Sequence, residues 1–201
     1  MAALRLMSLL GLVALTAAVP ARQGAPNELA VSAVRFYRPE GRFTQVKVFI
    51  QIPAMLLEPA GSAPGGQMTY LMDVRVRDST GLELVHNSWS GRVPAAARQP
   101  GATALEILEF PVTPGQYKIE VEVTDSASGR KLASGLPIEG FRSAPSLSDL
   151  LLAPLIREVG PTDTVPAPGE IRRGDLLITG SAELRLTPLR SKAFYLVEAY
   201  N

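Results

Sequence analysis

The chain has 201 residues, of which 46% are hydrophobic and 19% are charged. This balance is ordinary for a globular protein and too apolar for a disordered one, and the length allows one large or two small domains. The formal net charge is only +1, so the charge predicts no attachment to nucleic acid or to an anionic membrane.

Glycine, proline and cysteine usage narrows the class further. The 17 glycines and 17 prolines favour a fold with many turns, as in all-β proteins. The absence of cysteine excludes disulfides, thiolate catalysis and cysteine-ligated zinc. Small secreted animal domains usually carry disulfides, and this chain can form none. Together with a composition rich in Ala, Arg, Gly and Pro, this predicts a bacterial exported protein instead.

Residues 1–21, "MAALRLMSLLGLVALTAAVPA", have the layout of a secretory signal peptide. Arg5 precedes an apolar run over residues 6–19, and Val19 and Ala21 stand at the small-residue positions of a cleavage site. The apolar run is shorter than the ~20 residues that a membrane-spanning helix needs. We therefore expect export to the periplasm or beyond, with no membrane span after cleavage; an uncleaved anchor is the alternative.

Strands are predicted one after another beyond residue 28, separated by turn sequences such as "PEG", "DSTG" and "DSASG". Residues 43–52 alternate with period two, with Val46, Val48, Ile50 and Ile52 on one face, which is typical of a half-buried strand. Phe49 interrupts the polar face, so a second partner is expected to cover it. The predicted strands span residues 29–38, 43–52, 69–78, 82–93, 104–112, 117–124 and 130–138.

The most regular stretch is "TPGQYKIEVEVTDSASGRK", residues 113–131. Its apolar face consists of Tyr117, Ile119, Val121 and Val123. A tyrosine near the start of the penultimate strand is typical of the tyrosine corner of immunoglobulin-type sandwiches, with a core-edge aromatic as the alternative. We therefore predict an all-β fold with an immunoglobulin-like antiparallel β-sandwich over residues 28–140.

Residues 146–201 are predicted to form a partial or incomplete β module. The segments "SLSDLLLAPLI" (a strand or short helix), "DLLITGSAELRLTPL" (one or two strands) and "KAFYLVEAYN" (one strand) are too few for an independent domain. The tail either pairs with the sandwich or begins a second domain, and the sequence favours the second alternative.

His86 is the single histidine, so any nucleophile–histidine–acid arrangement would have to use it. It lies inside a predicted strand, which favours a partly exposed structural residue. Asp73, Arg75 and Arg77 share a strand face, and alternating charge of this kind is typical of solvated surface. The same holds for the three charged residues Lys118, Glu120 and Glu122 on a neighbouring strand.

Turn sequences offer weaker candidates. Asp78 and Asp125 lie in turns with Ser, Thr and Gly, but neither has the spacing of a calcium loop. The tripeptide Arg173-Gly174-Asp175 matches a cell-adhesion motif, although Gly-Asp is ordinary at a turn. Gly65-Gly66 lacks the Lys-Ser/Thr partner of a phosphate loop.

Trp89 and Phe49 are the aromatic candidates for a sugar- or partner-binding patch. Large aromatic side chains more often fill a core or the contact between domains, so burial is the favoured interpretation for both.

Four motifs give the chain a resemblance to a known family. "VRDSTG", "TPGQYKIEVEVTDSASGRK", "SLSDLLLA" and "FYLVEAYN" follow the signal peptide in that order. The arrangement resembles the N-terminal β region of bacterial exported GWxTD domain-containing proteins, and is also similar to β regions of von Willebrand factor A-related bacterial proteins. The Gly-Trp-x-Thr-Asp signature itself is absent, since Trp89 lies in Ser-Trp-Ser. The resemblance implies no activity and assigns no site residues.

The sequence thus predicts an exported, non-catalytic interaction or scaffold module of the cell envelope, with protein or glycan partners and no catalytic, metal or cofactor residues. The alternative is an accessory or carbohydrate-binding domain of a secreted enzyme. An enzyme needs a concave pocket with converging polar groups, whereas a binding module needs an exposed apolar patch or a free strand edge.

Overall fold

The computed structural model describes residues 28–61, 66–163, 165–186, 188 and 191–200. The predicted signal peptide therefore lies outside the described residues. Among the residues that are described, no helix is long and apolar enough to cross a membrane. Within these ranges the chain forms two single-turn 3₁₀ helices, η1 (Ala54–Leu56) and η2 (Ala95–Ala97), and otherwise strands and loops.

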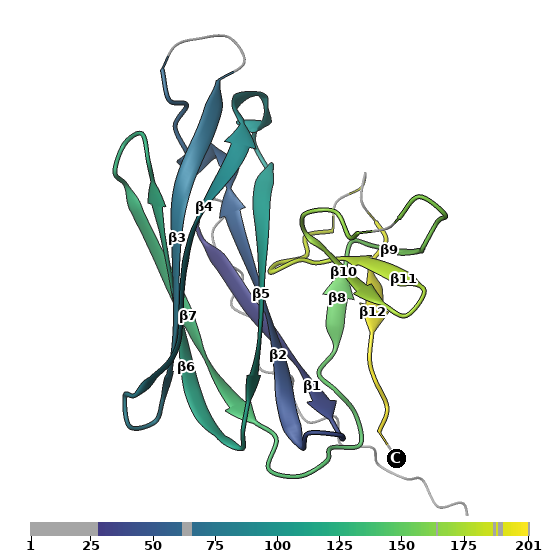
Figure 1. Cartoon of the computed structure of the whole chain (residues 1–201). Coiled ribbons are helices and arrows are strands. Elements are labelled where there is room, and N and C mark those ends of the chain that lie inside the picture. Colours follow the sequence, from purple (N-terminus) through teal and green to yellow (C-terminus); the bar gives the residue numbers. More distant parts are fainter. Residues whose placement is uncertain (1–27, 62–65, 164, 187, 189–190, 201) are drawn as a thin grey trace, which may run out of the picture.

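Seven strands form two antiparallel sheets that face each other (Figure 1). One sheet has the order β1-β2-β5 and the other the order β4-β3-β6-β7. The all-β sandwich predicted from alternation is therefore confirmed. The strands are β1 (Ala30–Arg38), β2 (Phe43–Pro53), β3 (Gln67–Asp78), β4 (Glu83–Pro94), β5 (Thr103–Val112), β6 (Gly115–Asp125) and β7 (Lys131–Gly140).

The topology is immunoglobulin-like, with one difference from the constant-type arrangement. The fourth strand, β4, pairs with β3 and lies at the edge of the four-stranded sheet, instead of pairing with β5. The short turn after Asp78 keeps β3 and β4 in one hairpin, because the Asp78 side chain accepts hydrogen bonds from the backbone amides of Thr80 and Leu82.

The sandwich core lies between the two sheets, and the alternating residues supply it. Val46, Val48, Ile50 and Ile52 of β2 are fully buried there. They face the inner side chains of β3 and of β6, where Ile119, Val121 and Val123 are at most 2% exposed. Period-two patterning thus predicted which face of each strand is buried.

Tyr117 forms the expected tyrosine corner. Its hydroxyl donates a hydrogen bond of 3.0 Å to the carbonyl oxygen of Thr113, four residues upstream. The side-chain hydroxyl of Thr113 lies 3.1 Å from the Tyr117 hydroxyl. The corner therefore ties the loop that precedes β6 to the strand itself, as the position of Tyr117 in the sequence indicated.

Residues beyond 146 add five short strands in two small antiparallel sheets, β10-β11-β9 and β12-β8. They are shorter than the sequence suggested. Pro154 separates the first two strands, and the described residues 192–200 contribute three strand residues plus an isolated bridge between Leu147 and Ala199. Proline cannot donate to a ladder, which explains the first break. The strands are β8 (Leu151–Ala153), β9 (Leu155–Glu158), β10 (Glu170–Arg173), β11 (Leu176–Thr179) and β12 (Phe194–Leu196).

This C-terminal segment packs on the outer face of the β1-β2-β5 sheet (Figure 1). Phe36 of β1 and Phe49 of β2 are fully buried in a second hydrophobic cluster, against Leu151, Ile171 and Ile178 of the segment. The cover that Phe49 was expected to have is therefore supplied by the C-terminal segment of the same chain. That the module is incomplete stays a prediction.

Candidate functional site

Charged side chains on the outer face of the four-stranded sheet pair with one another. Arg75 Nε lies 2.9 Å from Asp73, and Arg77 reaches Glu120 at 2.5 Å and Glu83 at 3.3 Å. Neighbouring strands bring these residues together, since Arg75 stands opposite Glu120 in the β3–β6 register. The predicted solvated face is thus a lattice of surface ion pairs.

His86 belongs to the same lattice. Its Nε2 atom lies 2.7 Å from Asp73 Oδ2, and its Nδ1 atom lies 3.5 Å from Glu83 Oε1. The hydrogen bond from His86 is the main reason that the pKa of Asp73 is lowered. Both ring nitrogens therefore face carboxylates, and among the described residues neither is hydrogen-bonded to a hydroxyl that would serve as a nucleophile.

A shallow hollow of about 500 Å³ lies beside this lattice, between β3, β6 and β7. Its charged lining is already paired: Lys118 Nζ is 2.8 Å from Glu120, and Glu122 is 2.8 Å from Lys131 Nζ. The hollow therefore presents no unpaired charge from these residues to select a ligand.

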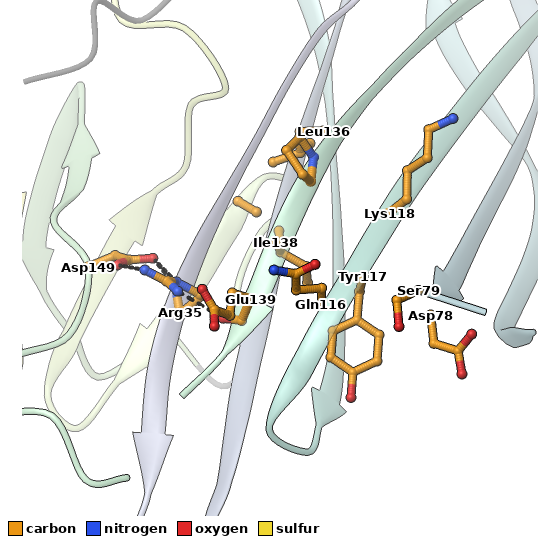
Figure 2. A pocket seen from close by; sticks show the side chains of 12 residues that line it. Arg35, Asp78, Ser79, Gln116, Tyr117, Lys118, Leu136, Ile138, Glu139 and Asp149 are labelled. Carbon is orange, nitrogen blue, oxygen red and sulfur yellow. Dashed lines mark hydrogen bonds and ion pairs between the residues drawn. The ribbon is translucent and has the colours of Figure 1, made fainter. Parts of the chain in front are cut away.

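A larger hollow of about 790 Å³ opens between the edge strands β1 and β7. Arg35 lies at its end and joins three parts of the chain (Figure 2). Its Nε and Nη2 atoms donate to the two carboxylate oxygens of Asp149 at 2.8 and 2.9 Å, and Nη1 donates to the carbonyl oxygen of Glu139 at 2.8 Å. The bond to Asp149 is the main reason that the pKa of Arg35 is raised. We call this hollow the seam and the Arg35–Asp149 pair the clamp. The hydrogen bonds of Arg35 hold parts of the same chain together, so its guanidinium is already bound within the protein.

The turn aspartates are engaged in backbone capping. Asp78 Oδ1 accepts from Thr80 N at 2.8 Å and from Leu82 N at 3.0 Å. Asp125 accepts from Ser128 N at 3.0 Å and from Glu58 N at 3.2 Å. These contacts agree with the favoured interpretation of both residues as turn residues. No group of three or more potential metal ligands comes together within the described ranges.

The Arg173-Gly174-Asp175 tripeptide forms the turn between β10 and β11, with Gly174 at φ +55°. The Arg173 guanidinium does not point into solvent. It contacts Glu198 and lies 4.9 Å from the centre of the Phe36 ring. This placement fixes the hairpin to the sandwich, so the arginine is not presented as an adhesion motif requires.

Both aromatic candidates are buried or partly buried. Trp89 packs partly buried against the sandwich core, and Phe49 is fully buried in the second cluster. Among the described aromatic residues, only Tyr195 is largely exposed, at 68%. The described residues thus do not form the row of exposed rings that a carbohydrate-binding surface requires.

The two-stranded β8–β12 sheet carries an exposed apolar face that the sequence analysis missed. Leu151 and Ala153 of β8 are buried, and Phe194 and Leu196 of β12 pack beside them on the sandwich. The alternate residues point the other way and are exposed: Leu150 (53%), Leu152 (46%), Tyr195 (68%) and Val197 (39%).

Leu152 and Tyr195 stand directly opposite each other in the ladder, so the four side chains form one cross-strand patch. The signal was present in "LLLA" and "FYLV", which are apolar at every position and not at every second one. Strands that read this way are typically covered on both faces, whereas this sheet is covered on one.

Comparisons with known proteins add little to this geometry. No family model matches the chain, and no curated protein matches it. Among solved structures, the chain is similar to Northeast Structural Genomics Consortium target SoR45, with 11% identity and a TM-score of 0.32, over 57% of this chain and 82% of that one. At this level of likeness no property of that protein is transferred.

Proposed function

We propose that the chain is an exported bacterial β-sandwich protein that acts as a non-catalytic interaction or scaffold module of the cell envelope. The exposed β8–β12 face carries this proposal. Contiguous apolar side chains on a soluble protein surface typically mark a contact with another macromolecule. Here the sandwich supplies a rigid support, because the opposite face of the same two strands is anchored in the second cluster.

The charged surfaces support the same proposal. The charged side chains around Arg75 and Arg77 form ion pairs with one another, and so do Arg35 and Asp149. A catalytic site needs polar groups that converge on free space. The export part of the proposal depends on the sequence of residues 1–21 alone.

A photo-crosslinking amino acid at Tyr195 tests the binding surface in cells that export the protein. We expect a discrete adduct, which disappears when Leu152→Ser is added, because that change removes half of the cross-strand pair. The matched control places the same amino acid at Lys118, an exposed position on the outer face of the other sheet. Equal adducts at both positions, or none at Tyr195, would contradict the proposal.

Export is tested separately by fusing residues 1–27 to an alkaline phosphatase that is active only outside the cytoplasm. We expect activity from the fusion, and loss of activity when Leu10→Asp interrupts the apolar run. A fusion that stays inactive would remove the export part and leave the interaction surface standing.

A further inference from the structure

The sandwich has four edge strands, and the hydrogen bonds at their ends show which backbone groups face outward. In an antiparallel pair, every second residue of a strand bonds to its neighbour. Ala95 N donates to Gly66 O at the end of the β3–β4 ladder. Odd-numbered residues of β4 therefore bond to β3, and the amides and carbonyls of His86, Ser88, Ser90 and Arg92 face away from the sheet.

Three of the four edges carry features that hinder further pairing. The same reasoning places Pro111 of β5 and Pro137 of β7 at outward positions, where a proline offers no N–H to a partner strand. On β1 the outward groups are capped: Arg35 N donates to the Asp149 carboxylate at 3.0 Å, and Tyr37 N donates to the Tyr200 hydroxyl at 2.8 Å.

The edge of β4 has no such feature along most of its length. Pro94 closes only its end, and residues 85–91, "VHNSWSG", contain no acidic residue, no lysine or arginine and no proline. By contrast, β5 carries the charged residues Glu106 and Glu109 within its central part, and charged side chains hinder the pairing of an edge strand. An edge that lacks charge and proline is the one most suited to pairing with another strand.

We propose that β4 pairs antiparallel with β4 of a second copy of this chain, across a two-fold axis close to Trp89. In this register the outward amides and carbonyls of the two copies face each other and can hydrogen-bond. Ser88 of one copy stands opposite Ser90 of the other, and His86 stands opposite Arg92. On the core side it places Trp89 against Trp89 of the second copy, and Val85 against Val93. Aromatic and β-branched cross-strand pairs stabilise such a ladder.

The same register also determines which side chains meet on the outer face. Arg92 makes no ion pair among the described residues, whereas His86 lies between the carboxylates of Asp73 and Glu83. Pairing His86 with Arg92 places the Arg92 guanidinium of each copy beside the ion-pair lattice of the other copy, in which Asp73 and Glu83 already contact Arg75 and Arg77. This contact occurs at both ends of the interface, because a two-fold axis repeats every interaction. The two four-stranded sheets then continue as one sheet. This inference is independent of the β8–β12 face.

Trp89 is the single tryptophan, so its emission reports on this interface directly. We expect the purified protein, lacking residues 1–21, to sediment as a dimer at high micromolar concentration and as a monomer on dilution. The Trp89 emission should shift to longer wavelength along the same dilution curve, because the ring is only partly buried in one copy. A monomer at every concentration would overturn the proposal.

Ser88→Pro removes one outward N–H in each copy and leaves the β3 ladder intact. We expect the dissociation constant to rise about tenfold or more, since hydrogen bonds at the interface are lost. The matched control is Ala133→Pro on the outward side of β7, which should leave dimerisation unchanged. A dimer that survives Ser88→Pro, or that Ala133→Pro weakens equally, would overturn the proposal.

A cysteine cross-link tests the register without proline. The natural chain has no cysteine, so Trp89→Cys places a single thiol beside the axis, where facing Cα atoms of a non-hydrogen-bonded pair are about 4.5 Å apart. We expect a disulfide-linked dimer under mild oxidation. Asn87→Cys, whose counterpart lies four residues away along the ladder, should not cross-link. Efficient cross-linking of Asn87→Cys alone would overturn the register.

Discussion

The Phe49 ring lies directly against the backbone of Gly180, where the outer face of β2 meets the C-terminal segment. A Cβ atom at residue 180 would collide with two atoms of that ring. The glycine therefore allows the segment to approach the sheet closely enough for Phe49 to be fully buried. Glycine is required here for space, and not for an unusual backbone angle.

Gly180→Ala should weaken this junction. Because the interior around Phe49 is already filled, the added methyl group must displace the ring or the segment, at a cost of about 1–3 kcal/mol in the free energy of unfolding. Urea denaturation followed by far-UV circular dichroism measures the loss. Val165→Ala, at a side chain that is 77% exposed, serves as the control and should change stability by less than about 0.5 kcal/mol. An equal effect of both changes would contradict the packing described here.

Phe49→Ala should destabilise the protein more strongly, by about 3–5 kcal/mol, because it leaves a cavity between the sandwich and the C-terminal segment. It should also release residues beyond 146 to limited proteolysis while the sandwich stays resistant. Mass spectrometry of the first cleavage products tests this. First cuts within β3 or β6 would show that the second cluster is not the weaker part.

Tyr117→Phe removes the hydroxyl that closes the tyrosine corner. We expect a loss of about 1 kcal/mol, the usual net value of one hydrogen bond. Thr113→Val should cost less, because the acceptor is the carbonyl oxygen of Thr113 and stays in place. Thermal and urea unfolding of the two variants compare them, and a larger loss for Thr113→Val would point to its own hydroxyl as the stabilising group.

Arg35 and Asp149 should be energetically coupled. The pair is bidentate, but its side chains are 28% and 31% exposed, so screening limits the coupling to about 1 kcal/mol. A double-mutant cycle with Arg35→Ala and Asp149→Ala measures it. Additive single effects would mean that the two side chains stabilise the protein through their separate bonds, that of Arg35 to the Glu139 carbonyl and that of Asp149 to the Arg35 backbone amide.

Asp125 should make stability depend on pH in the acidic range. Burial raises the pKa of its carboxyl, but hydrogen bonds from Ser128 and from backbone amides outweigh that effect, and the pKa is lowered overall. A carboxyl with a lowered pKa in the folded state stabilises above its unfolded pKa of about 3.9, and this contribution disappears as the pH falls through the folded value. Asp125→Asn should flatten the decline in stability below about pH 4. A decline as steep as that of the unaltered protein would assign it to other carboxyls.

The sandwich was predictable from sequence because side chains that face its core alternate along the strands with side chains that face away from it, even where the C-terminal segment covers the outer face of the β1-β2-β5 sheet. The alternation in residues 43–52 and 117–124 predicts which side chains face the sandwich core, and the structure confirms it. The strands beyond 146 were harder to locate, since "LLLA" and "FYLV" lack alternation and Pro154 divides a run that reads as continuous. Three-residue strands carry too few positions for a period to be recognised.

The candidate surfaces were less predictable, because they depend on pairing between distant residues. Nothing local in the sequence links Arg35 to Asp149, or Leu152 to Tyr195. Lys47 is a further example: it stands on the polar side of its strand, yet it is only 6% exposed and pairs with Glu109 of β5. Register across strands decides such contacts, and a single strand does not contain that information.

The cap on β1 also affects the order in which the chain can fold during synthesis. The amide of Tyr37 is satisfied by the hydroxyl of Tyr200, a residue that leaves the ribosome 163 positions later. Translation proceeds from the N-terminus at about 5–20 residues per second, so a nascent sandwich waits for seconds with this flank uncovered. Throughout that interval the seam beside β1 is open to chaperones, or to a neighbouring nascent chain.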